Sequence, residues 1–414
     1  MADITGGALL LFAPCPRGLE DALVAELAEL RILGAHAVAG GVHASGTLAD
    51  VYCINLRSRI ASRVLLRLAQ GKYRSDDDIY KLARSQDWGA WFGPERSLRV
   101  DVTSGSGRAR SPVKSIEFVT LRIKDTICDR LRAETGKRPD IDTRAPDVRV
   151  FGYLDADTCT LYLDTSGDAL FKRGWRTETV EAPLRENLAA GILRLAGWKP
   201  GIALLDPMCG SGTFVVEAAQ TAFGIAPGAQ RRFGFEKLKN FDAALWDSLR
   251  AAPDRAPSAF EHGSLGLYAC DVSGDAVVFT RANLERAGVP AETALAIAPK
   301  QIDARHIKPP AASGIRVVNP PYGERVGVRG AAPASTGRDP DAETFFAEFG
   351  NTLKQRFAGW QCHVLTSDMA FQKKLHLAPN RRVPLFNGAI ECRLYRFDLV
   401  AGRPGAEPPA PAMT

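Results

Sequence analysis

The sequence predicts an α/β protein: a mostly parallel, doubly wound sheet that ends in an antiparallel hairpin, preceded by two smaller α+β units. Apolar strand-like runs and amphipathic helices alternate from residue 202 to about 399, which is typical of a parallel sheet. Asn387-Gly388 lies between two strand-like runs, 382–386 and 389–397, and this is the strongest short hairpin signal. Helix and strand patterns are mixed before residue 165.

The composition is that of a folded, soluble chain of roughly two to three domains. Its 414 residues are 45% hydrophobic and 24% charged, and the net charge of +6 permits a polyanionic partner without requiring one. Eight cysteines form no CxxC pair and six histidines no HExxH pattern, so we expect no metal and no disulfide framework. We also expect a cytoplasmic protein without membrane contact, because no long apolar stretch or secretory signal is visible.

The first 165 residues are expected to form two α+β units, 1–50 and 51–165. The first combines a strand (8–13), a helix (18–30) and a hairpin (38–47). In the second, patterns of period 3.6 and period 2 predict helices at 51–68, 79–91 and 115–132 and strands at 97–103, 148–154 and 158–164. Residues 166–181 are expected to be a linker, and the Pro/Ala-rich residues 401–414 a disordered tail.

Basic side chains gather after the glycine-rich stretch 104–107. They are candidates for a phosphate-contacting face, which would give affinity without sequence reading. A solvated, arginine-rich surface explains the same pattern equally well. The candidates are Arg108, Arg110, Lys114, Arg122 and Lys124.

In the C-terminal half, the alternation gives the order of the predicted elements. Strands are expected at 202–205, 267–270, 294–298, 315–318 and 362–365, and helices at 183–195, 213–223, 274–287, 342–357 and 369–377. Residues 224–266 are too long for a simple connection and are expected to be an insertion with helices of its own. A loop rich in Gly, Ala and Arg is expected at 323–340.

The loop after the strand at 202–205 predicts a cofactor pocket. Ligands bind at the carboxyl ends of strands in open α/β sheets, and glycines let the backbone approach a ligand. The loop lacks the Lys of a triphosphate-binding loop and departs from GxGxxG, so a nicotinamide dinucleotide is the second choice. The candidate residues are Asp206, Pro207, Cys209, Gly210, Gly212 and Thr213.

Two more acids follow predicted strands. Asp271 could accept hydrogen bonds from ribose hydroxyls, and Asp303 from an adenine amino group. A single acid at a strand end is usually a helix cap or a solvated turn. Three of them, with Asp206, favour a nucleoside ligand.

The stretch Asn319-Pro320-Pro321-Tyr322 is a candidate clamp for a planar amine. Acceptors on both N–H groups localise the nitrogen lone pair and stabilise the charge that develops in the transition state. The Asn319 side chain and the Pro320 carbonyl can accept, and Tyr322 can stack on a base. The alternative is a proline-rich loop with a buried tyrosine.

Cys209 has two interpretations. It could be a nucleophile for methylation at a pyrimidine ring carbon. It lies in the cofactor loop, however, and no Pro-Cys dipeptide occupies the clamp. We therefore expect a small packing residue.

The loop 206–213 together with the clamp 319–322 resembles those of class I S-adenosylmethionine-dependent amino-methyltransferases. Upstream, Arg17-Gly18-Leu19-Glu20, Gly40-Gly41-Val42 and the stretches 139–150 and 164–168 resemble a ferredoxin-like segment joined to a THUMP RNA-binding domain. Residues 182–190 resemble the family's entry into its catalytic domain. The resemblance covers residues 8 to 399 and is nearest to bacterial 23S rRNA guanine-N2 methyltransferases without a second fused methyltransferase domain.

The resemblance implies a Rossmann-like class I domain with a seven-stranded sheet at 182–400, after a ferredoxin-like segment (1–50) and a THUMP domain (51–165). It implies that S-adenosylmethionine lies along the loop, Asp271 and Asp303, with Glu186 and Asn187 nearby. It also implies that Asn319, Pro320 and Tyr322 hold a guanine flipped out of large-subunit (23S) rRNA.

Three alternatives stay open from the residues. The same chemistry could act on tRNA, where THUMP domains also occur. The clamp alone also fits DNA adenine-N6 methylation, although an RNA-binding half argues against it. A non-catalytic ribosome-assembly factor is disfavoured by the intact acids and clamp.

Overall fold

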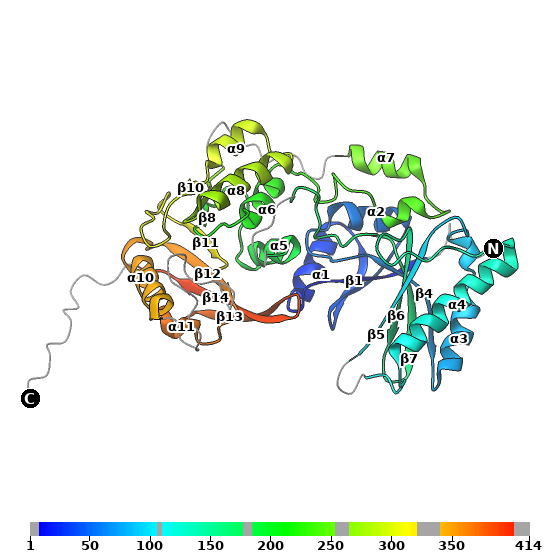
Figure 1. The fold of residues 1–414 in the computed structure, drawn as a ribbon. Helices are drawn as coiled ribbons and strands as arrows, with labels where there is room; N and C mark the ends of the chain where they lie inside the picture. Colours follow the sequence, from blue (N-terminus) through cyan, green and yellow to red (C-terminus); the bar gives the residue numbers. More distant parts are fainter. Residues whose placement is uncertain (1–7, 106–109, 177–183, 253–264, 321–339, 401–414) are drawn as a thin grey trace, which may run out of the picture. The chain divides into compact units, whose positions relative to one another are not determined.

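The computed structural model describes residues 8–105, 110–176, 184–252, 265–320 and 340–400. The chain divides into two compact units (Figure 1). The first comprises the described residues up to Trp175 together with 224–252, and the second comprises the remainder. Arg108, Tyr322, most of the loop 323–340 and the tail 401–414 lie outside the described residues.

One seven-stranded sheet, in the order β2-β3-β1-β4-β7-β6-β5, runs through the first unit. The central strand β4 and its neighbour β1 connect the two predicted α+β units, because Leu11 and Phe12 of β1 pair with Leu66 and Leu65 of β4. Only β5 and β6 are parallel. The strands are β1 (Leu9–Pro14), β2 (Leu33–Val38), β3 (Gly41–Gly46), β4 (Leu65–Lys72), β5 (Leu98–Ser104), β6 (Val148–Leu154) and β7 (Thr158–Asp164).

Most helices of this unit lie where they were predicted, but the helix expected at 79–91 begins at Asp76 and ends at Arg84, followed by a separate 3-10 turn at Trp88–Ala90, and one further prediction fails. They are α1 (Glu20–Glu29), α2 (Leu48–Arg57), α3 (Asp76–Arg84), the 3-10 helix η1 (Trp88–Ala90), α4 (Ile116–Thr135), the 3-10 helix η3 (Gly234–Lys237) and α7 (Ala243–Ala251). The helix expected at 51–68 is wrong after Arg57: the backbone is extended at Ser58, and β4 follows. Pairing with β1 and β7 outweighs the amphipathic pattern here. The expected boundary between residues 50 and 51 falls inside α2.

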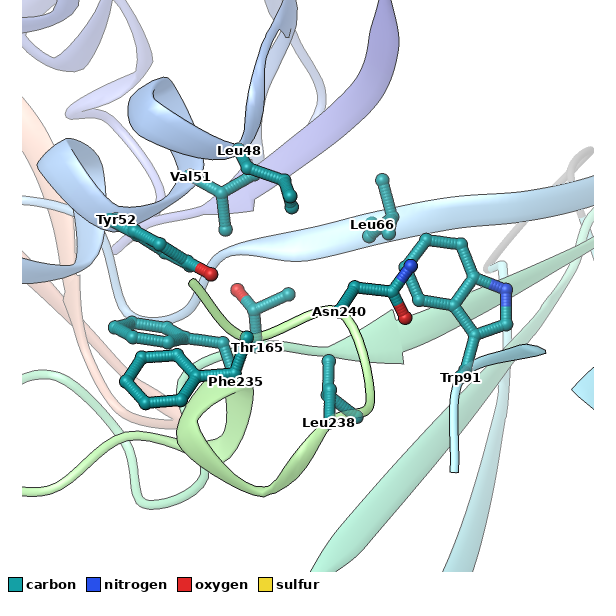
Figure 2. A pocket seen from close by; sticks show the side chains of 10 residues that line it. Leu48, Val51, Tyr52, Leu66, Trp91, Thr165, Phe235, Leu238 and Asn240 are labelled. Atoms are coloured by element: carbon teal, nitrogen blue, oxygen red, sulfur yellow. The ribbon is translucent and has the colours of Figure 1, made fainter. Parts of the chain in front are cut away.

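The insertion expected within the catalytic domain packs, in its described part, as a piece of the first unit. Phe235 stacks on Tyr52 of α2 with ring centroids 4.3 Å apart, and Trp246 meets Phe235 edge-on at 5.0 Å. Arg57 donates to the carbonyl of Leu249 at 2.9 Å. Figure 2 shows the small, mostly apolar cavity that remains between α2, Trp91 and this segment.

The second unit contains the predicted sheet. Its order is β10-β9-β8-β11-β12-β14-β13, and β14 is antiparallel to both of its neighbours. The expectation of a mostly parallel sheet ending in a hairpin is confirmed, and the hairpin turns at Gly388, where φ is +67°. The strands are β8 (Leu204–Asp206), β9 (Leu267–Asp271), β10 (Lys300–Gln301), β11 (Gly314–Val318), β12 (Trp360–Thr366), β13 (Arg381–Asn387) and β14 (Ile390–Asp398).

Its helices are α5 (Glu186–Leu195), α6 (Thr213–Ala222), α8 (Gly274–Arg286), α9 (Ala291–Ile297), α10 (Pro340–Arg356) and α11 (Phe371–Lys374). The strand expected at 294–298 is wrong, because most of that run is the end of α9. Its alanines are strong helix formers, and Ala298 ends the helix in a left-handed conformation. The strand that occupies this place in the sheet is β10, whose two exposed polar residues give no apolar signal.

Arg316 of β11 is fully buried in the core of this unit. Its guanidinium lies between Phe349 and Phe357, 4.6 Å from each ring centroid, and Nη2 donates to the carbonyl of Ala304 at 3.3 Å. Nε and Nη1 have no hydrogen-bond partner among the described residues. Burial lowers the pKa of Arg316 to about 10. The core thus carries an incompletely satisfied charge.

Replacing Arg316 by Met is therefore expected to stabilise the protein by about 1–3 kcal/mol, because an unpaired buried charge costs more than an apolar side chain of similar volume. Calorimetric unfolding of the two proteins measures the difference. Arg316→Ala is the matched control, expected to destabilise because it opens a cavity between the two phenylalanines. A Met variant less stable than wild type would show that the two ring contacts outweigh the desolvation cost.

Candidate active site

The second sheet reverses its strand order between β8 and β11. From β8 the sheet continues through β9 to β10, and from β11 it continues through β12 in the opposite direction. The register pairs Leu204 with Ile315 and Leu205 with Arg316, so Asp206 and Asn319 follow at the same carboxyl edge. Such a switch point is where open α/β sheets bind ligands.

Asp206 is buried at this edge, with 1% of its surface exposed. Burial raises the pKa of its carboxyl to about 8; the nearby Asp271 contributes to this rise, whereas the N–H of Met208, which donates at 3.2 Å, and the charge of Arg316 oppose it. The carboxyl is therefore largely protonated at neutral pH. A cationic ligand would draw it into its charged form.

The raised pKa predicts a pH dependence of folding. An unfolded Asp titrates near 3.8, so between pH 3.8 and about 8 the native state holds a proton that the unfolded state lacks. Stability then falls as pH rises through this window, by up to about 1.4 kcal/mol per pH unit. Asp206→Asn is expected to remove this contribution, so that its stability advantage over wild type grows from pH 5 to pH 8 in denaturant unfolding. A constant difference across that range would contradict the assignment.

The loop after Asp206 is held by its own neighbours. The N–H of Gly210 donates to Asp271 Oδ2 at 2.9 Å, and the N–H of Ser273 donates to Asp271 Oδ1 at 2.9 Å. Asn283 of α8 donates to the carbonyl of Ser211 at 2.8 Å. Asp271, expected to bind a ribose, therefore also fixes the loop, and each of its oxygens retains further acceptor capacity.

Gly212 is required by packing. Its φ is +80°, and a Cβ there would lie 2.6 Å from Cγ2 of Thr280 on α8. From the sequence, we expected this glycine to allow close approach of a ligand. The structure explains it by the contact between the loop and α8.

Cys209 lies buried in the same loop, with Sγ 3.4 Å from Oγ1 of Thr280. Burial raises its pKa well above the usual range for a thiol. A thiolate is thus disfavoured, which supports the packing role over the nucleophilic one. Pro207, beside it, is also buried.

Thr213 at the start of α6 is bound by Arg176, a residue that was not among the predicted site residues. Arg176 donates from Nη2 to Thr213 Oγ1 at 2.7 Å, and its Nε lies 3.1 Å from Glu186 Oε1 at the start of α5. Both partners of this ion pair are largely buried, and Asn187 next to Glu186 is 1% exposed. Arg176 thereby ties the starts of α5 and α6 together. In the sequence it is one of several basic residues at 171–176, and nothing distinguishes it from the others.

Asp303 lies beyond β10 and has a partner of its own. Its carboxylate forms an ion pair with Arg305 (2.7 Å), which also reaches Glu348 of α10 at 2.7 Å. Its hydrogen bonds with Arg305 lower the pKa of Asp303. If Asp303 accepts a hydrogen bond from adenine, its carboxylate must do so while it remains paired with Arg305.

Asn319 and Pro320 directly follow β11. Oδ1 of Asn319 is buried and accepts no hydrogen bond from any residue that the structure describes. Pro320 is buried beside it. An unpaired buried acceptor costs free energy. An N–H donor from a ligand would satisfy it.

In the first unit, the predicted RNA-binding residues differ in their exposure and in whether an acidic side chain pairs with them. Arg110 and Lys114 are exposed. Arg122 pairs with Asp76 and Asp77 of α3, and Lys124 pairs with Asp125. The charge of α4 is thus partly neutralised by neighbouring acids.

Across the described ranges, no three His, Cys, Asp or Glu side chains gather as metal ligands would. The helices described there also include none with the length and apolar character needed to cross a membrane.

These features define a methyltransferase domain. The family model described as "RMKL-like, methyltransferase domain" matches residues 173–396, and the chain belongs to this family. The model of the RlmL ferredoxin-like domain matches residues 10–65, and the THUMP domain model matches residues 73–164. The expected fold, a class I methyltransferase domain preceded by ferredoxin-like and THUMP domains, is therefore confirmed.

Among individual proteins, the chain is 38% identical to the ribosomal RNA large subunit methyltransferase K/L of Psychromonas ingrahamii, over 98% of this chain and 52% of that protein. The chain spans about half the length of the curated relatives that it matches. The solved structure of SMU.472, described as "a putative methyltransferase complexed with SAH", has a TM-score of 0.80 and 27% identity, covering 96% of this chain and 99% of that one. A structure from Listeria monocytogenes, described as "a predicted N6-adenine-specific DNA methylase", has a TM-score of 0.81 and 24% identity, covering 95% of this chain and 97% of that one. The last likeness shows the fold alone.

Proposed function

We propose that the chain transfers a methyl group from S-adenosylmethionine to the exocyclic N2 amine of a guanine in large-subunit (23S) rRNA. The observation that carries the proposal is the buried Oδ1 of Asn319, which lacks a described donor at the edge where the cofactor loop ends. An exocyclic amine is the donor that suits it.

The residues around Asp206 suit a cationic nucleoside cofactor. S-adenosylmethionine supplies a methyl group on a positively charged sulfur. The buried Asp206 carboxyl, with its pKa of about 8, can become charged beside such a cation. Asp271 and Asp303 are proposed to face the ribose and the adenine, and the loop residues 207–213 with Glu186 and Asn187 to complete the pocket.

Asn319 is proposed to act on the acceptor nitrogen. Its Oδ1 and the carbonyl of Pro320 would each accept one N–H of the amine, which localises the lone pair on nitrogen and stabilises the positive charge that forms as the methyl group arrives. No strong base is required before attack, because the alkylated nitrogen loses its proton readily. Tyr322, outside the described residues, is proposed to stack on the flipped base.

Two observations support large-subunit rRNA as the substrate: the names of the relatives and the domain at the N-terminal half of the chain. The relatives that the chain matches are named for the large ribosomal subunit RNA, and the THUMP model matches this chain. We assign RNA docking to residues 51–165, catalysis to 182–400 and a linker to 166–181, with 1–50 as the ferredoxin-like segment. The reaction would take place in the cytoplasm.

The polymer is tested by incubating the chain with methyl-labelled S-adenosylmethionine and purified 23S rRNA, tRNA or DNA. We expect label in rRNA. Label only in tRNA would favour the tRNA enzyme, and label only in DNA would favour an adenine-N6 enzyme. RNA binding without any label would favour a non-catalytic assembly factor, and each of these results would overturn the proposal.

A further inference from the structure

One arginine of the second unit contacts the starts of two helices, α5 and α6, which pack side by side (Figure 1). Arg176 donates from Nη2 to Thr213 Oγ1 at 2.7 Å and to the carbonyl of Leu184 at 3.2 Å. Its Nε lies 3.1 Å from Glu186 Oε1. Thr213 is the first residue of α6, Glu186 is the first residue of α5, and Leu184 lies two residues before it. A single side chain therefore fixes the entry of both helices.

A second carboxylate lies near the same arginine. Glu217 follows Thr213 by one helical turn, so both side chains lie on one face of α6. Glu217 is fully buried, and the side chains of Arg176 and Glu186 are nearly so. Burial lowers the pKa of Arg176, whereas the charges of Glu186 and Glu217 raise it. The cluster therefore contains one cation and two acids, all largely removed from water.

The cluster is joined to the cofactor loop at the last residue of that loop. The other residues of the loop are held by β9 and α8, because Asp271 accepts from the N–H of Gly210 and Asn283 donates to the carbonyl of Ser211. Arg176 holds the end of the loop at Thr213. Glu186, on the other side of the arginine, is itself a predicted cofactor residue. The position of one set of predicted cofactor residues relative to the other thus depends on Arg176.

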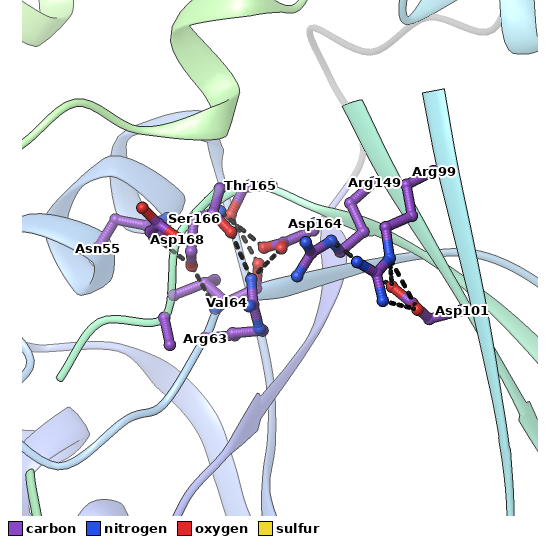
Figure 3. Close-up of polar contacts among 12 residues, drawn as sticks. Asn55, Arg63, Val64, Arg99, Asp101, Arg149, Asp164, Thr165, Ser166 and Asp168 are labelled. Carbon is purple, nitrogen blue, oxygen red and sulfur yellow. Dashed lines mark hydrogen bonds and ion pairs between the residues drawn. The ribbon is translucent and has the colours of Figure 1, made fainter. Parts of the chain in front are cut away.

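Stability alone does not explain such a cluster. The desolvation of buried charges offsets their attraction, so apolar side chains would join two helices at least as well. A guanidinium adds geometry, because its planar fork fixes the directions of several acceptors at once. The first unit offers a comparison in Arg63 and the fully buried Asp164, whose contact Figure 3 shows. That ion pair belongs to the other compact unit and to no predicted cofactor residue.

From these contacts we infer that Arg176 is a positioning residue for S-adenosylmethionine. It sets the loop 206–213 against Glu186 and Asn187, so that the cofactor residues at the starts of α5 and α6 are in place before the cofactor binds. A site that is already ordered binds its ligand more tightly, because less ordering is left for the binding step. The inference rests on the proposed function in that this loop is the cofactor site, and it adds a residue that acts through Thr213 and Glu186.

The test is calorimetric titration of the full chain with S-adenosylmethionine in the absence of RNA. Arg176→Ala is expected to raise the Kd about tenfold, the loss that corresponds to one charge-assisted hydrogen bond. In the transfer assay the KM for the cofactor should rise by the same factor, with kcat at saturating cofactor nearly unchanged. Arg176→Lys keeps the charge but not the fork, and its Kd is expected to lie between those of wild type and Arg176→Ala.

Two further variants separate positioning from a general loss of structure. Arg63→Ala breaks the buried ion pair of the first unit, so it should lower the melting temperature and leave the Kd for the cofactor unchanged. Thr213→Val removes the hydroxyl that accepts from Arg176 and keeps a branched side chain. If the arginine acts through this threonine, the rises in Kd of Arg176→Ala and Thr213→Val will not multiply in the double variant.

An unchanged Kd in folded Arg176→Ala, an equal rise in Arg63→Ala, or fully multiplicative losses in the double variant would each overturn the inference. If Arg176→Ala does not fold, Arg176→Lys replaces it in the same comparisons, and a wild-type Kd there overturns the inference. Failure of the proposed function gives a different result. Wild type would then bind S-adenosylmethionine with an affinity that depends on Arg176, and yet place no label in rRNA.

Discussion

Asn319→Ala is expected to lower the rate of methyl transfer by about 10²–10³-fold, with binding of S-adenosylmethionine and of RNA nearly unchanged. The reason is that the buried Oδ1 would stabilise charge that develops only in the transition state, and one such polar group is worth this much in other enzymes. Single-turnover transfer of labelled methyl groups, with both ligands saturating, measures the chemical step directly.

The control for Asn319 is Asn319→Asp, which retains an acceptor oxygen at the same position. It is expected to preserve more activity than the Ala variant. Equal losses of transfer, cofactor binding and RNA binding in Asn319→Ala would show that the side chain holds the fold of the loop after β11, and the assigned role would be wrong.

Gly212→Ala is expected to destabilise the protein by about 3 kcal/mol and to weaken cofactor binding. Two costs add. Alanine is strained at a φ of +80°, and its Cβ would lie 2.6 Å from Thr280 Cγ2, an overpacking that alone costs about 1–3 kcal/mol. Calorimetric unfolding gives the stability, and titration with S-adenosylmethionine gives the affinity.

Gly201 provides the matched control, because its φ is +95° and a Cβ there would meet no atom within 4 Å. Gly201→Ala carries the backbone cost alone, about 1 kcal/mol. Adding Thr280→Ala to Gly212→Ala should recover part of the remaining loss. If Gly212→Ala is no more destabilising than Gly201→Ala, the contact with α8 does not determine the need for glycine.

The second unit could be predicted well because its signals are local and strong. Buried parallel strands appear as short apolar runs, and Asn387-Gly388 specifies a two-residue turn by backbone geometry alone. The same runs place Asp206, Asp271 and Asn319 at strand ends, so the topology of the sheet brings them to one edge.

The errors occur where long-range pairing or packing decides. Residues 65–68 fall within the amphipathic helix predicted at 51–68 but belong to β4, a central strand, because β1 and β7 both pair with it. Arg176 and Thr213 are 37 positions apart, and Gly212 and Thr280 lie on different elements. One sequence carries no sign of such contacts, so the hydrogen bonds and packing that hold the loop 206–213 are visible only in the fold.

The identity of the labelled nucleoside tests the central claim most directly. After wild-type chain has transferred labelled methyl groups to 23S rRNA, the RNA is digested to nucleosides and separated against standards. We expect the label in N2-methylguanosine, and its loss with Asn319→Ala. Label in N6-methyladenosine, or at a ring carbon of a pyrimidine, would contradict the assignment of guanine N2 as the acceptor.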